Sequence, residues 1–260
     1  EDLLKIFLIL FLPLLLFSRI QIRTYFPVET HIVKKIGQKE IVPREITNRY
    51  LSEFRKIPSS EISRLSNSKI YFHFGLDIEK EYESILIEKN PNLKIIDMSK
   101  DVNKINNNPY IWMDPFAMRV IAKNIYEALI ELDNNKKDFY KENYERFLDE
   151  IDDTFLKIKQ KMSGSEITTI YAFDDYWDYF ANRFRLDIIK KEKKYLNITD
   201  VSDTLQFTQD RNIKKLLFYR GMDYNIALSL SSNLNVEIIE DDIFGDNWQF
   251  NLLNLSQNLF

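Results

Sequence analysis

The sequence predicts an α/β protein of two lobes, each built on a parallel sheet flanked by helices, with one long helix joining them. Strand-like and helix-like segments alternate in both halves of the chain, as they do in proteins with parallel sheets. Between the halves, residues 136–163 carry the longest amphipathic pattern of the sequence. The 260 residues are enough for two lobes of about 120 residues each, and we expect these lobes over 19–135 and 164–260.

The first half begins with a strand and a helix. Residues 19–26 (RIQIRTYF) are rich in β-branched and aromatic side chains, and 28–37 (VETHIVKKIG) show the apolar spacing of an amphipathic helix. A further helix is expected at 58–68, which starts with Pro and Ser as helices often do. The remaining strands of this half are predicted at 69–75 (KIYFHFG) and 93–98 (LKIIDM).

The stretch NPYIWMDP (108–115) predicts the start of a helix. Asp114 is a good N-cap residue, and Pro115 suits the first helical turn. Apolar residues then recur at spacings of three and four, so we expect a helix over about 115–131. Tyr110 lies just before this turn from strand to helix, where α/β folds usually hold their ligands.

Residues 136–163 predict a helix long enough to run across both lobes. Apolar residues share one face: Tyr140, Tyr144, Phe147, Leu148, Ile151, Phe155 and Ile158. A helix of this length would extend about 40 Å, which is more than one lobe needs. A long surface helix or a coiled-coil arm is the alternative.

The second half repeats the rhythm of strands and helices. Strands are predicted at 168–173, 214–219 and 235–240, and helices at 176–184, 223–234 and about 247–259. One aromatic group could line a ligand pocket or belong to the core: Tyr171, Phe173, Tyr176, Trp177, Tyr179 and Phe180.

The composition excludes several classes of function. The formal net charge of −4 argues against a nucleic-acid partner, which needs a basic face. The chain has no cysteine, so disulfides, thiolate nucleophiles and cysteine-bound metals are excluded. With two histidines, His31 and His73, and no visible nucleophile–base pair, we do not expect an enzyme. We expect His73 to be packed or hydrogen-bonded within its strand and His31 to lie on a helix face.

The N-terminal stretch KIFLILFLPLLLFS (5–18) contains an apolar run of about a dozen residues. Such a run is short for a membrane span, which needs about 20 residues, and matches the h-region of a signal peptide. We therefore expect residues 1–18 to be a signal peptide or membrane anchor. The protein would then work outside the cytoplasm, in the periplasm or at the cell surface. A buried core helix is the alternative.

Five stretches, in order along nearly the whole chain, carry a resemblance. They are YFPVETHIVKKIG (25–37), FGLDIE (74–79), NPYIWMDP (108–115), ELDNNKKDFYKENYERFLDEID (131–152) and FDDYWDYFANRFRL (173–186). They resemble, in turn, the first strand and helix, an Asn-Gly-Leu-x-Leu-Glu turn, an Asp-Pro-His-x-Trp-x-Asp-Pro motif, a lobe-joining helix and a Phe-His-Asp-Ala-Phe-Gly-Tyr-Phe-Ala stretch. These belong to the solute-binding proteins of zinc- and manganese-type ABC transporters.

The resemblance implies four metal ligands and places each on this sequence. One histidine of the family falls near Ser52 and another on Tyr110. A third ligand, histidine or glutamate, falls on Asp174. The last, an aspartate, falls on Asp242, with Asp241 beside it. Both first-lobe histidines are thus replaced, the third ligand is a shorter carboxylate, and only the final aspartate remains.

The chemistry of these residues leaves three alternatives. Zinc favours imidazole and thiolate ligands, whereas oxygen donors suit harder ions, so manganese or iron is expected rather than zinc if a metal binds. A neutral tyrosine is a poor ligand, so the site could equally bind no metal. A small organic ligand is the third alternative.

Two functions follow from the resemblance. The first is an extracytoplasmic receptor, expected as a monomer, that hands a solute to an ABC transporter permease. The second is an adhesin-like interaction protein on the same fold, which binds a cell-surface partner and no metal.

Overall fold

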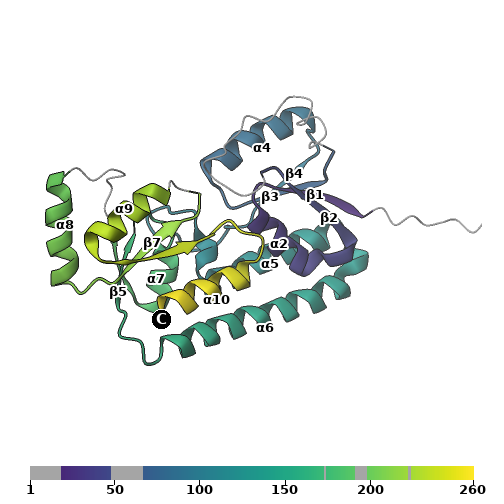
Figure 1. Cartoon of the computed structure of the whole chain (residues 1–260). Coiled ribbons are helices and arrows are strands. Elements are labelled where there is room, and N and C mark those ends of the chain that lie inside the picture. The colour runs from purple at the N-terminus through teal and green to yellow at the C-terminus, as the bar shows by residue number, and fades with distance from the viewer. Residues whose placement is uncertain (1–18, 48–66, 173, 191–197, 222–223) are drawn as a thin grey trace, which may run out of the picture.

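The structure, a computed structural model, describes residues 19–47, 67–172, 174–190, 198–221 and 224–260. Two parallel four-stranded sheets are joined by one long helix, so the predicted fold class is confirmed (Figure 1). None of the described helices has the length and apolar character needed to cross a membrane. The predicted signal or anchor at 1–18 lies outside the described residues, as does nearly all of the helix predicted at 58–68.

The first lobe holds a sheet in the order β2-β1-β3-β4. Its strands are β1 (Ile20–Thr24), β2 (Ile41–Glu45), β3 (Ile70–His73) and β4 (Lys94–Asp97). Its helices are α2 (Pro27–Gly37), α4 (Asp77–Lys89) and α5 (Pro115–Leu132), with short 3₁₀ turns η1 (Gln38–Glu40) and η3 (Ile111–Met113). After β1 the chain continues to the edge strand β2, and after β3 it continues to the opposite edge strand β4. The strand order therefore reverses between β1 and β3, and a crevice for ligands is expected at the carboxyl ends of these two strands.

The second lobe repeats this topology in the order β6-β5-β7-β8. Its strands are β5 (Thr169–Ala172), β6 (Asp187–Lys190), β7 (Lys215–Tyr219) and β8 (Glu237–Asp241). Its helices are α7 (Asp178–Phe184), α8 (Ile198–Asp210), α9 (Tyr224–Leu234) and α10 (Trp248–Leu259). The equivalent switch point of this sheet lies between the ends of β5 and β7.

The joining helix α6 (Lys137–Met162) follows the 3₁₀ turn η4 (Asn134–Lys136) and runs beneath both lobes (Figure 1). It packs against α2 and α5 of the first lobe and against α10 of the second. The predicted apolar face is buried at Tyr140, Phe147, Ile151 and Ile158. One continuous cluster of buried apolar residues extends from β1 through α6 to α10. The two lobes therefore share a core.

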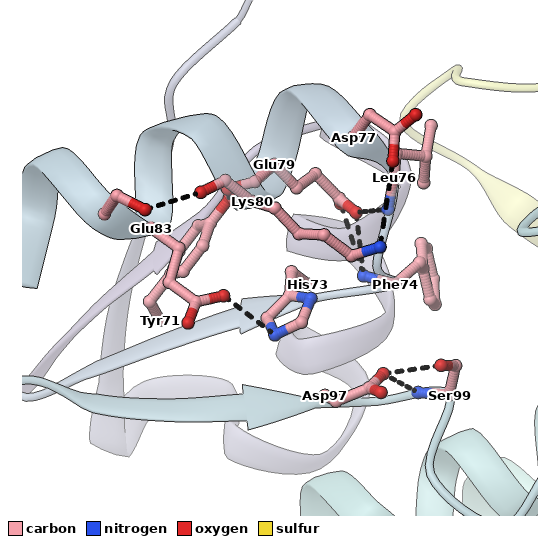
Figure 2. Close-up of polar contacts among 11 residues, drawn as sticks. Tyr71, His73, Phe74, Leu76, Asp77, Glu79, Lys80, Glu83, Asp97 and Ser99 are labelled. Atoms are coloured by element: carbon pink, nitrogen blue, oxygen red, sulfur yellow. Dashed lines mark hydrogen bonds and ion pairs between the residues drawn. The ribbon is translucent and has the colours of Figure 1, made fainter.

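Two buried glutamates hold the starts of helices α2 and α4. Glu29 Oε2 accepts hydrogen bonds from the backbone N–H groups of Tyr25 and Phe26 at 2.5 and 3.0 Å. Glu79 accepts from the N–H of Leu76 at 2.6 Å and of Phe74 at 3.2 Å (Figure 2). Neither glutamate is exposed to solvent. Burial first, and then the neighbouring charge of Glu79, raise the pKa of Glu29 well above its ordinary value.

We expect Glu29→Gln to stabilise the protein at neutral pH. Because the folded state raises the pKa of Glu29, its contribution to stability is present below the ordinary carboxyl pKa and is lost as pH rises toward the folded pKa. Glutamine keeps an oxygen for the two N–H groups and removes the repulsion with Glu79. A gain of about 1 kcal/mol would raise the melting temperature by roughly 2–4 °C.

Thermal unfolding between pH 5 and 8 measures this effect. The difference between variant and parent should grow with pH. The control is Glu81→Gln, which removes an exposed carboxylate from α4 and should leave the profile nearly unchanged. If the melting temperatures of variant and parent differ by the same amount at every pH, the pKa of Glu29 is not raised in the folded protein.

Candidate functional site

Tyr110 is held in place by Asn108, which ties the loop before α5 to the second lobe. The backbone N–H of Tyr110 donates to Asn108 Oδ1 at 2.8 Å. Asn108 Nδ2 donates to the carbonyl of Asp175 at 2.6 Å, and the Tyr179 hydroxyl donates to the Asn108 carbonyl at 2.8 Å. The loop that carries Tyr110 is therefore bonded to the segment that follows β5.

The ring of Tyr110 lies in an aromatic cluster between the lobes. It meets the ring of Tyr176 edge to face, with centroids 4.6 Å apart. Trp112 and Phe244 lie at 5.6 and 6.1 Å, and Tyr219 packs on Tyr176 at 5.3 Å. We call these five residues the junction cluster. Aromatic rings thus surround the place that the resemblance assigns to a metal-binding imidazole.

Most of the aromatic group predicted after β5 belongs to the core. Tyr171, Trp177, Tyr179 and Phe180 are buried, whereas Tyr176 is half-buried in the junction cluster. Phe173 lies outside the described residues.

Asp174 lies close to Tyr110 and Tyr176 of the junction cluster. Burial, and then the charges of Asp175 and Asp174, raise the pKa of Tyr110. Burial is also the main reason that the pKa of Tyr176 is raised, and Asp174 adds to it. Both phenols are therefore neutral at physiological pH, and a neutral phenol is a weak metal donor. Tyr110 and Asp174 are thus near enough to influence each other electrostatically, while Ser52 lies outside the described residues.

Asp241, at the end of β8, is a buried carboxyl group. Its Oδ2 accepts a hydrogen bond from Trp177 Nε1 at 2.7 Å. Burial raises the pKa of Asp241 to about 7, and the neighbouring charge of Asp242 adds to the rise, while the Trp177 hydrogen bond and Arg220 oppose it. At neutral pH this side chain therefore carries only part of a negative charge.

Asp242, the one retained ligand of the resemblance, faces an arginine. Arg220 Nη1 lies 3.7 Å from Asp242 Oδ2, and Arg220 Nε donates to Glu240 at 2.7 Å. The backbone carbonyl of Asp242 accepts from Gly245 N and Asn251 Nδ2, both at 3.0 Å. Arg220 thus places a positive charge next to the carboxylate that the resemblance assigns to a metal. The sequence analysis did not include Arg220 among the site residues. Its position directly after β7, at the carboxyl end of the sheet, could have indicated that it lies near the site.

Around this place, the two lobes are joined by reciprocal tryptophan hydrogen bonds. Trp112 Nε1 donates to the Ile243 carbonyl at 2.8 Å, and Trp248 Nε1 donates to the Trp112 carbonyl at 2.6 Å. The Val28 N–H also donates to the Phe244 carbonyl at 3.3 Å. Buried polar groups from both lobes are therefore satisfied only when the lobes are together.

Asp114 adds a charged bond to this junction. Its Oδ1 caps α5 by accepting from the Phe116 N–H at 2.8 Å, which confirms the predicted helix start. Arg183 of α7 binds the same carboxylate with both Nε and Nη2, at 2.6 and 2.7 Å. Because two parallel hydrogen bonds form between the guanidinium and the carboxylate, this ion pair fixes the relative orientation of the two side chains as well as pairing their charges.

The two histidines lie apart from the candidate site, and among the described residues no group of three His, Cys, Asp or Glu side chains could hold a metal. His73 ends β3, is buried, and has its Nε2 3.8 Å from Glu83 (Figure 2). His31 lies on α2. That the predicted donors form one binding site stays a prediction.

Comparison with known proteins decides the family. The profile of the family described as the zinc-uptake complex component A, periplasmic, matches residues 23–248. The chain belongs to this family. Members with solved structures share its two-lobed architecture: the crystal structure of ZnuA superposes with a TM-score of 0.85 at 19% identity, covering 93% of this chain and 98% of ZnuA.

Other relatives are similarly distant. A manganese-bound periplasmic metal-binding protein from Candidatus Liberibacter asiaticus superposes with a TM-score of 0.78 at 16% identity, covering 93% of this chain and all of that one. A Chlamydia muridarum protein, provisionally named as metal-binding, is 21% identical over 209 residues, 74% of each chain. The manganese ABC transporter substrate-binding lipoprotein PsaA of Streptococcus mitis is 24% identical over 174 residues, 60% of this chain and 52% of that protein.

Proposed function

We propose that this protein is an extracytoplasmic solute-binding protein of a metal-type ABC transporter, with an altered or degenerate metal site. In this role it would deliver its solute to the transporter permease and would carry out no chemistry of its own. Family membership supports the receptor role. The observation that carries the altered site is the junction cluster, where Tyr110 packs on Tyr176 instead of presenting an imidazole.

The charges around the site support the same proposal. Tyr110 is neutral, Asp241 carries only part of a charge at pH 7, and Arg220 lies beside Asp242. A divalent ion would have to compete with this arginine for the retained carboxylate. Oxygen donors remain, so manganese or iron should compete well against zinc.

Calorimetric titration of the chelator-treated protein with zinc, manganese and iron tests the proposal. We expect zinc to bind no more tightly than a dissociation constant of about 10 µM, or roughly 7 kcal/mol. Asp242→Ala should remove what binding there is. Arg220→Met should tighten binding by up to about fivefold, because a partly exposed ion pair contributes about 1 kcal/mol at most.

The matched control is Arg119→Met, which removes the same charge from an exposed pair with Asp152 and should leave the titration unchanged. Tight zinc binding that disappears in Asp242→Ala would mean that the metal site is intact and that its other ligands are misplaced here.

The second candidate function is an adhesin-like surface protein that uses the same fold without a metal. The tryptophan hydrogen bonds and the Asp114–Arg183 pair favour it, since they hold the lobes together without any ion. Absence of binding for all three ions, together with binding of the protein to intact cells, would support this function over transport.

A further inference from the structure

A cavity lies between the first lobe and the joining helix, and none of its lining residues belongs to the junction cluster. It has a volume of about 230 Å³ and is formed where α2 faces the joining helix α6. Three lining residues come from α2, four come from α6, and Gln38 comes from the turn η1, so the cavity depends on the packing of these two helices.

Positive charge dominates the lining of this cavity. Lys34 and Lys35 come from α2, and Arg146 comes from α6. Glu150 is the acidic residue of the lining and is bonded to Lys35 at 2.5 Å. Arg146 also bonds Glu142 at 2.9 Å on the outer surface of the helix, an exposed pair that is weak in water. Lys34 and Arg146 therefore leave a surplus of positive charge.

The cavity also holds polar groups suited to hydrogen bonding. Gln38 Nε2 donates to Asn143 Oδ1 at 2.8 Å, and buried Asn143 donates to the Ile36 carbonyl at 3.0 Å, so the amides have fixed positions. His31 contributes its imidazole to the lining, while its Nε2 is shielded from solvent.

We propose that this cavity binds a phosphate-class oxyanion, held by Lys34 and Arg146 beside the imidazole of His31. Such an anion offers several acceptor oxygens to the lysine and the arginine fork together. A free phosphate compound and the phosphate of a lipid headgroup present the same chemistry to these side chains.

The imidazole of His31 provides a direct readout. Burial, and then the charge of Lys35, lower its pKa to about 4, with Lys34 acting in the same direction and Asp246 and Glu150 opposing it. A bound anion favours the imidazolium, so it should raise this pKa by at least about one unit. Because the chain has two histidines, their NMR signals are assigned with His31→Gln alone.

The first experiment titrates the full chain with inorganic phosphate at constant ionic strength and follows both imidazoles by NMR. We expect the His31 signals and pKa to move while those of His73 stay fixed, and the shift to disappear in Lys34→Gln/Arg146→Gln. The control Lys159→Gln/Lys161→Gln removes the same charge from the far end of α6 and should behave like the parent. A shift that chloride reproduces, or that the first double variant retains, would overturn the proposal.

The second experiment separates the two sources of phosphate. The protein is sedimented with vesicles of pure phosphatidylcholine and with vesicles containing phosphatidylglycerol. Sedimentation with the anionic vesicles that Lys34→Gln/Arg146→Gln abolishes assigns the site to a lipid headgroup. A phosphate-dependent His31 shift without sedimentation assigns it to a free phosphate compound. Failure of both experiments rejects the site.

Discussion

Replacing Trp112 by alanine is expected to lower the free energy of unfolding by about 3–5 kcal/mol, the usual range for a buried aromatic residue. Trp112 stacks on Phe74 with centroids 4.5 Å apart and has no exposed surface. Its indole also binds the Ile243 carbonyl of the other lobe. The loss corresponds to a fall in melting temperature of roughly 6–20 °C, measured by circular dichroism.

Two further variants identify the source of this effect. Trp112→Phe keeps an aromatic ring but leaves the Ile243 carbonyl without its donor, which should cost about 1–3 kcal/mol. Phe250→Ala removes an aromatic side chain that is 62% exposed on α10 and should change stability by less than about 0.5 kcal/mol. A Trp112→Ala protein as stable as Phe250→Ala would show that the junction contributes little.

The second large effect is a gain of zinc affinity. The variant Tyr110→His/Asp174→His, made together with Arg220→Met, should bind zinc at least about a hundredfold more tightly than the parent, or about 2.7 kcal/mol. Two imidazoles would replace a neutral phenol and a carboxylate, and the competing guanidinium would be absent. Imidazole nitrogen is a preferred donor for zinc. Calorimetry with zinc measures the change.

The control places histidines on the surface of the second lobe. Tyr224→His/Asp210→His makes the same kinds of substitution at exposed positions and should bind zinc as weakly as the parent. If the junction variant folds normally and gains no affinity, Tyr110 and Asp174 do not face Asp242, and the ligand positions taken from the resemblance are wrong.

Local sequence chemistry predicted much of the fold. The start of α5 followed from Asp114 and Pro115, and α6 followed from one apolar face that repeats from Tyr140 to Ile158. β2 was missed because Pro43 lies inside it; the strand tolerates proline because it forms the edge of the sheet. Helix α4 was missed because its charged sequence buries only Glu79, Tyr82 and Leu86.

The candidate site was harder to predict, because its contacts join distant parts of the chain. The family motifs at 108–115 and 173–186 predicted that Tyr110 and Asp174 lie near each other, because each motif leads into a helix at the edge where α/β folds hold ligands. Arg220 could not be paired with Asp242 in this way, since the pair depends on how the ends of β7 and β8 lie side by side. The filling of the junction by Tyr176 and Phe244 likewise depends on the packing of the two lobes.

The reciprocal bonds of Trp112 and Trp248 also give the protein a built-in optical reporter. Its three tryptophans are all buried: two lie at the junction, and the third, Trp177, packs on Tyr176 and is bonded to Asp241. Indole emission shifts to longer wavelength when the ring meets water. The intrinsic fluorescence of the unlabelled protein should therefore follow any separation of the lobes, and a solute that leaves the spectrum unchanged would be bound without opening them.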